Sequence, residues 1–132
     1  MLRVALSAGK VFYDLDAHRR EAGDHDTALV RIEQLYPFPA AQVKAALARY
    51  PAATDVVWVQ EEPRNMGAWE FLDGRLAECL ADRQALRYAG RPRSGSPATG
   101  SFKRHLAEQR ALVLDAFGAV RVASPASRTH GS

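Results

Sequence analysis

The stretch Val56-Val57-Trp58-Val59-Gln60-Glu61-Glu62-Pro63-Arg64-Asn65-Met66-Gly67-Ala68-Trp69 decides the fold. Its first four residues are apolar, which is typical of a strand covered on both faces of a sheet. We expect Pro63 to end the pairing of this strand, Asn65 and Gly67 to form a turn, and Trp69 to open a helix. The stretch therefore predicts a strand, a polar loop and a helix, with the polar groups at the strand end where open α/β sheets bind ligands and partners.

Three further strands and four helices follow from the periodicity of the apolar residues. Short apolar runs predict the strands, over residues 3–6, 27–32 and 86–89. Apolar residues at helical spacing predict the helices, over residues 10–21, 40–50, 69–80 and 102–117. This alternation predicts a three-layer α/β sandwich with a mostly parallel sheet and right-handed crossovers. We assign residues 1–118 to this domain and expect the small and polar residues 119–132 to form a flexible tail.

The composition argues against several classes of protein. With 132 residues, 47% of them apolar, the chain is long enough for one domain with a single core. Lys and Arg (18) barely outnumber Asp and Glu (15) and form no basic stripe with interleaved aromatics, which argues against nucleic-acid binding. No apolar run approaches the roughly 20 residues of a membrane span and no signal peptide is visible, so we expect a soluble, cytoplasmic protein. The single cysteine, Cys79, rules out an internal disulfide and is spaced as a buried helix residue.

Polar residues at the end of the third strand are the first candidate site. Glu61 and Glu62 are adjacent, so on a strand they point to opposite faces and cannot form an acid/base pair with each other. One of them can face a cleft, but no second catalytic group is visible nearby. The alternative is that Gln60, Glu61, Glu62 and Asn65 make hydrogen bonds and ion pairs that fix the loop or an interface. The sequence assigns no catalytic residue.

The loop over residues 90–101 is the second candidate, because it is longer than an ordinary connection between a strand and a helix. Ser101 can cap the next helix, and a helix N-terminus favours anions. The basic residues around the loop are Arg91, Arg93, Lys103 and Arg104. The loop is not a P-loop, since Ser101 stands where that motif needs its lysine. An anion site and a solvated surface loop are equal alternatives here.

The histidines indicate no metal site, because their positions do not have the spacing of metal ligands. They are His18, His25, His105 and His130. We therefore predict no bound metal ion.

Four motifs carry a resemblance to a known family. They are Ser7-Ala8-Gly9-Lys10-Val11-Phe12-Tyr13-Asp14-Leu15, Val30-Arg31-Ile32-Glu33-Gln34-Leu35-Tyr36-Pro37-Phe38-Pro39, the opening stretch from Trp58 onward, and Arg87-Tyr88-Ala89-Gly90-Arg91-Pro92 with Ser96-Pro97-Ala98-Thr99-Gly100. In this order they resemble the carboxyl-terminal domain of the first, decarboxylating component of 2-oxoglutarate dehydrogenase. The resemblance covers roughly residues 2–118.

The resemblance implies a transketolase carboxyl-terminal-like fold, usually with five strands of which one is antiparallel, so the sheet has four to five strands. It implies a homodimeric enzyme that decarboxylates 2-oxoglutarate oxidatively in the tricarboxylic acid cycle and works with a dihydrolipoyl succinyltransferase complex. Thiamine diphosphate and magnesium belong to the preceding domains, and the isolated domain is expected to be inactive. The cofactor motif Gly-Asp-Gly is absent, since the only Asp-Gly here, Asp73-Gly74, follows a leucine inside a predicted helix.

The resemblance also implies an effector site, for acetyl-CoA, another acyl-CoA or a nucleotide such as AMP, shared with a neighbouring domain. By position, Gln42 and Arg49 are the residues that this domain offers to the effector. They are seven residues apart, so on a helix they point the same way; the alternative is two solvated helix residues. Two positions depart from the family, Ala8 in place of a serine and Phe102 in place of a histidine. The rival hypotheses are a free-standing regulatory module that binds acyl-CoA or a nucleotide, and a remnant that binds nothing.

Overall fold

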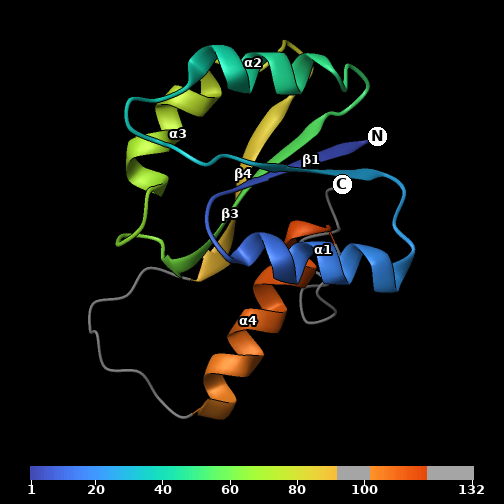
Figure 1. The fold of residues 1–132 in the computed structure, drawn as a ribbon, viewed down its shortest axis with the longest axis vertical. Helices are drawn as coiled ribbons and strands as arrows, with labels where there is room; N and C mark the ends of the chain where they lie inside the picture. Colours follow the sequence, from blue (N-terminus) through green and yellow to red (C-terminus); the bar gives the residue numbers. More distant parts are fainter. Residues whose placement is uncertain (92–101, 119–132) are drawn as a thin grey trace, which may run out of the picture.

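Four parallel strands form a single sheet in the order β2-β1-β3-β4. The computed structural model describes residues 1–91 and 102–118 (Figure 1). Its elements are β1 (Arg3–Ser7), α1 (Val11–Ala22), β2 (Thr27–Arg31), α2 (Ala40–Ala48), β3 (Asp55–Pro63), α3 (Trp69–Ala77), β4 (Ala85–Arg91) and α4 (Phe102–Ala116). The predicted α/β class, parallel sheet and element order are confirmed. The described residues contain no fifth, antiparallel strand, and the predicted tail lies outside them.

Helices cover both faces of the sheet, which makes the three predicted layers (Figure 1). Successive side chains of a strand point to opposite faces, so Val4 and Leu6 of β1 pack with α2 and α3, whereas Ala5 packs with α1 and α4. Trp58 of β3 is 2% exposed and lies in the core beneath α2 and α3. The described helices include none that is long and apolar enough to cross a membrane.

The chain leaves the carboxyl ends of β1 and β3 toward opposite faces. It passes from β1 to β2 through α1 on one face, and from β2 to β3 and on to β4 through α2 and α3 on the other. Right-handed crossovers place α1 on one face and α2 and α3 on the other, because the chain moves from β1 to β2 in one direction along the sheet and from β2 to β3 and β4 in the opposite direction. In open sheets of this kind, the crevice between two such strand ends is where ligands bind.

Several predicted boundaries differ from the structure, among them the ends of β3 and α3. Strand β3 does not stop before Pro63: after an irregularity that begins at Gln60, Pro63 pairs with Arg91 of β4. The proline is tolerated because β1 ends at Ser7, opposite Val59, so the other edge of β3 carries no ladder beyond that point. Helix α3 ends at Ala77, so Cys79 follows the helix, although it is buried as predicted.

Candidate functional site

A group of charged and polar side chains lies at the carboxyl ends of the strands, on the face of the sheet that α1 and α4 cover. We call it the carboxyl-edge network, and its members are Lys10, Asp14, Glu61, Arg91, Glu108 and Gln109. Glu61 belongs to it because it follows Val57 and Val59, which point to the same face of β3. The network therefore joins two helices and two strands at the place where an α/β sheet is expected to bind a ligand.

Glu61 is held by two donors. Its Oε2 accepts hydrogen bonds from Lys10 Nζ at 2.9 Å and from Gln109 Nε2 at 2.8 Å. The hydrogen bond to Glu61, and then its charge, raise the pKa of the Lys10 ammonium. Lys10 therefore stays a cation beside Glu61.

Gln109 bridges the remaining members. Its Nε2 also donates to Asp14 Oδ2 at 2.8 Å, and its Oε1 accepts from Arg91 Nη2 at 2.6 Å. Arg91, which is only 9% exposed, forms an ion pair with Glu108 at 2.8 Å. One amide thus ties α4 to α1, β3 and β4, and each charged group of the network has a protein partner.

Ser7 differs from the members of the network in the hydrogen bonding of its side chain. It is fully buried at the end of β1, and its hydroxyl has no hydrogen-bond partner in the described part of the chain. Ala5, two residues earlier on β1, packs with α1 and α4, so Ser7 faces the same layer as the network.

The amide of Gln60 fixes the chain between β3 and α3. The side chain is 3% exposed. Its Oε1 accepts from Trp58 Nε1 at 3.0 Å and from the backbone N–H of Trp69 at 3.1 Å. Its Nε2 donates to the carbonyls of Glu62 and Pro63 at 3.2 and 3.0 Å. The Gln60 amide therefore makes four hydrogen bonds that link the end of β3 to the start of α3.

Gly67 is required by close packing against this amide. A Cβ at position 67 would lie 2.5 Å from the Gln60 side chain, closer than any real contact. Arg64 also contacts aromatic rings at this loop between β3 and α3: its guanidinium lies 5.0 Å from the ring centroid of Tyr88 and 5.8 Å from that of Trp69. Burial raises the pKa of the Tyr88 phenol to about 12, so it remains a donor, to the Arg91 carbonyl at 2.8 Å. The loop is therefore held by the Gln60 amide and by the contacts of Arg64 with the two aromatic rings.

Two more residues, Glu62 and Asn65, were predicted for this strand end. Glu62 is exposed and offers its backbone carbonyl to Gln60. Asn65 is half-buried in the loop between β3 and α3. The structure thus brings Gln60 and Glu61 into ordered contacts on two different sides of β3.

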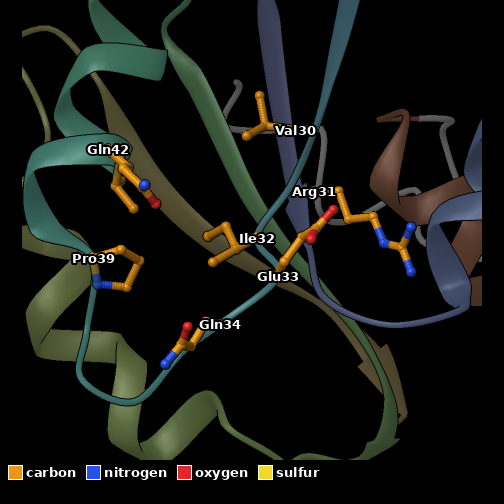
Figure 2. A pocket seen from close by; sticks show the side chains of 8 residues that line it. Val30, Arg31, Ile32, Glu33, Gln34, Pro39 and Gln42 are labelled. Atoms are coloured by element: carbon orange, nitrogen blue, oxygen red, sulfur yellow. The ribbon is translucent and has the colours of Figure 1, made fainter.

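A separate pocket lies between the end of β2 and the start of α2 (Figure 2), with a volume of about 330 Å³. It is lined by Val30, Arg31, Ile32, Glu33, Gln34, Pro39, Gln42 and Val43. The guanidinium of Arg31 points away from it (Figure 2) and donates to Tyr13 Oη at 3.1 Å. Gln42 thus lines a pocket, whereas Arg49 is exposed at the carboxyl end of α2 and is not among the lining residues.

The predicted anion loop is only partly described. Arg91 was expected in that loop, but it ends β4, nearly buried and paired with Glu108. Lys103 and Arg104 are exposed on the first turn of α4. Arg93 and Ser101 lie outside the described residues, so anion binding by this loop stays a prediction. Among residues 1–91 and 102–118, no group of His, Cys, Asp or Glu side chains could hold a metal ion.

Sequence reasoning missed four members of the network: Lys10, Asp14, Glu108 and Gln109. Gln109 has a visible signal, because it interrupts a stripe of apolar residues that includes Leu106 and Val113 on the last helix. A polar residue in such a stripe needs a buried partner. Asp14 has no such signal, since it looks like any charged residue on the outer face of a helix.

Fold and site together define a doubly wound parallel α/β domain whose strand-end charges are held by one another. The chain matches the family "2-oxoglutarate dehydrogenase C-terminal" over residues 1–117 and belongs to it, which confirms the resemblance. It is 49% identical over 119 residues to the 2-oxoglutarate dehydrogenase E1 component of Cupriavidus necator, covering 90% of this chain. The components of that name from Brucella anthropi and Brucella ovis are 50% identical over 120 residues, covering 88% of this chain. The chain spans 12% of the length of each of these relatives.

Proposed function

We propose that the chain works as the carboxyl-terminal domain of a 2-oxoglutarate dehydrogenase E1 component and supports an active site built by the rest of that polypeptide. The family match carries the proposal, together with the state of the carboxyl-edge network. A general acid or base must reach the reacting group of the substrate. Glu61, the best candidate by position, is instead held by Lys10 and Gln109. In this proposal the chain contributes positioning rather than a reacting group.

The cofactor belongs to the other domains in this proposal. Thiamine diphosphate with magnesium would supply the decarboxylation chemistry there, and the donor set of the described residues does not fit a magnesium site. The domain would contact the preceding domains and a second copy of the polypeptide in a homodimer. The dihydrolipoyl succinyltransferase of the complex would take the product, as in the oxidative step of the tricarboxylic acid cycle.

The test compares the 132-residue chain with the complete polypeptide that carries it. We expect the complete polypeptide to reduce ferricyanide in the presence of 2-oxoglutarate, thiamine diphosphate and Mg²⁺, and the 132-residue chain to show no turnover. Turnover by the chain alone would contradict a supporting role. A preference for another 2-oxo acid would show that the proposed substrate is wrong. A complete polypeptide that consists of this domain alone would favour the free-standing binding module.

We also propose that α2 offers Gln42 and Arg49 to an acyl-CoA effector rather than to a small nucleotide. The two residues are seven positions apart, which is about 10 Å along a helix. The pocket beside Gln42 has its one arginine turned away and suits a neutral, hydrogen-bonding part of the ligand. Arg49, outside the pocket, then suits a phosphate. A long ligand such as acetyl-CoA satisfies both, whereas AMP is short for this span.

Calorimetric titration of the complete polypeptide tests this effector proposal. We expect Gln42→Ala and Arg49→Ala each to weaken acetyl-CoA binding about tenfold, as the loss of a charge-assisted or buried hydrogen bond does. Lys44→Ala is the matched control, because Lys44 is exposed on α2 but lies on another side of the helix from Gln42. Equal affinities for all three variants and the parent would refute the assignment, as would tighter binding of AMP than of acetyl-CoA.

A further inference from the structure

Exposed apolar side chains follow the carboxyl ends of all four strands. Five of the exposed large apolar residues lie in segments that follow strand ends: Tyr13 after β1, Tyr36 after β2, Met66 after β3, and Phe102 and Leu106 after β4. Since the strands are parallel, all these segments leave the same edge of the sheet. Apolar residues concentrated on one side of a domain are typical of an interaction surface.

Helix α4 makes the largest contribution to this surface. Phe102, Leu106, Gln109, Val113 and Ala116 recur at intervals of three and four residues, so they form one stripe along the helix. The second half of the stripe is buried against the sheet, with Val113 at 8% and Ala116 at 0% exposure. In the first half, Phe102 and Leu106 are 75% and 51% exposed. The same apolar stripe thus continues beyond the sheet without a partner in the described structure.

We call residues 102–107 the α4 overhang. All six are exposed, and Figure 1 shows the start of α4, in orange, extending away from the sheet. The overhang carries Lys103, Arg104 and His105 beside its two large apolar residues, and it contains no Asp or Glu. A complementary surface has an apolar recess with acidic groups around it.

We propose that the α4 overhang docks into an apolar, acidic-rimmed recess in another part of the same E1 polypeptide. This rests on the proposed function, because the long relatives supply the partner: the chain spans only 12% of their length. A second copy of this domain is a poorer occupant. A symmetric contact through the same patch would bring the exposed Lys103 side chains of both copies into one interface, and like charges across an interface oppose association.

Cysteine labelling tests the docking, with Leu106→Cys as the probe and Ala107→Cys as its control. Ala107 is the next residue and is also exposed, but it points about 100° round the helix. Cys79 gives little background, because it is 8% exposed and burial raises the pKa of its thiol. Both introduced thiols should react with a maleimide at similar rates in the 132-residue chain. In the complete polypeptide, Leu106→Cys should react about tenfold more slowly and Ala107→Cys at a nearly unchanged rate.

A second variant shows that the apolar contact causes the protection. Phe102→Asp, added to Leu106→Cys, should restore fast labelling in the complete polypeptide, because it places a charge in the recess. Fast labelling of Leu106→Cys without Phe102→Asp would overturn the proposal. So would protection of Leu106→Cys that appears in the 132-residue chain as its concentration rises, since a second copy would then be the occupant.

Turnover of 2-oxoglutarate by the unsubstituted complete polypeptide separates this inference from the proposed function. Protection at Leu106→Cys without turnover would support the docking and overturn the activity. Turnover without protection would overturn the docking and leave the activity in place.

Discussion

At the scale of single residues, a few buried polar side chains hold the strand ends. Gln60 shows what the sequence could predict and what it could not. Its position after an apolar run marked it as a strand-end residue, and the hypothesis of structural hydrogen bonds describes its contacts in the domain. Its bond to Trp69 joins residues nine positions apart, and Gly67 is needed beneath it because no side chain fits there. Neither fact can be predicted from the sequence, because both depend on how the loop between β3 and α3 folds back onto β3.

Gln60→Leu should destabilise the fold while keeping much of the side-chain volume. Leucine removes the acceptor of Trp58 Nε1 and of the Trp69 N–H, and leaves both donors buried. An unsatisfied buried donor costs about 1–3 kcal/mol, so the free energy of unfolding should fall by at least that amount. Urea denaturation of the 132-residue chain measures it. A decrease below about 0.5 kcal/mol, the range of an ordinary surface substitution, would refute a structural role.

Asp55 gives the fold a dependence on pH. Burial by itself raises the pKa of the Asp55 carboxyl, but the hydrogen bonds and charges of Arg87 and Arg3 together outweigh it and lower that pKa. The three bonds are 2.7 Å from Arg3 Nε and 2.8 and 3.0 Å from Arg87. A carboxyl with a lowered pKa stabilises the fold fully above its unfolded pKa, about 3.9. This contribution is lost as the pH falls through the folded pKa.

Asp55→Asn should therefore lower the urea midpoint at pH 7 and flatten its fall between about pH 5 and pH 2. The control is Asp16→Asn, whose carboxylate pairs with Arg20 within α1, and it should change stability by less than about 0.5 kcal/mol. Parallel pH profiles for Asp55→Asn and the parent chain would show that Asp55 does not produce this dependence.

At the scale of elements, α4 depends on contacts that local sequence does not reveal. The order of helices and strands follows from periodicity, because the period of the apolar residues reports which face is buried. The ends of elements do not follow, because Pro63 can extend β3 only where β1 has already ended. The predicted loop over residues 90–101 began two residues too early for a similar reason, because β4 continues to Arg91. Arg91 is polar and basic, but pairing with β3 and the ion pair with Glu108 bring it into the sheet.

Gln109→Ala should loosen α4 from the sheet. The substitution takes one partner from Arg91, which is nearly buried, and removes the bridge between the Asp14 and Glu61 carboxylates. We expect a loss of about 1–3 kcal/mol in the free energy of unfolding and faster amide exchange in α4. Arg110→Ala is the control, since Arg110 is the exposed neighbour. Equal stability of the two variants would contradict the role of Gln109 as the link between α4 and the sheet.

At the scale of the whole molecule, the carboxyl end of the sheet has the features of a surface that contacts other domains. One end of its sheet holds an internally paired network of charges, and the segments around that end expose apolar side chains. The family could be recognised from sequence motifs, because these coincide with the strand ends and loops that the structure holds in place. Glu61 was predicted to make hydrogen bonds rather than to transfer protons, but its partners Lys10 and Gln109 could not be named from the sequence, because they come from other parts of the chain.

Glu61→Gln in the complete polypeptide tests the supporting role most directly. The measurements are kcat for 2-oxoglutarate turnover and the thermal unfolding midpoint. Loss of the ion pair with Lys10 should lower the unfolding midpoint slightly. The value of kcat should change by no more than a few-fold, because in this proposal Glu61 transfers no proton in the reaction. Removal of a general acid or base costs about 10²–10⁴ in rate. A fall in kcat of that size at an unchanged midpoint would contradict the supporting role.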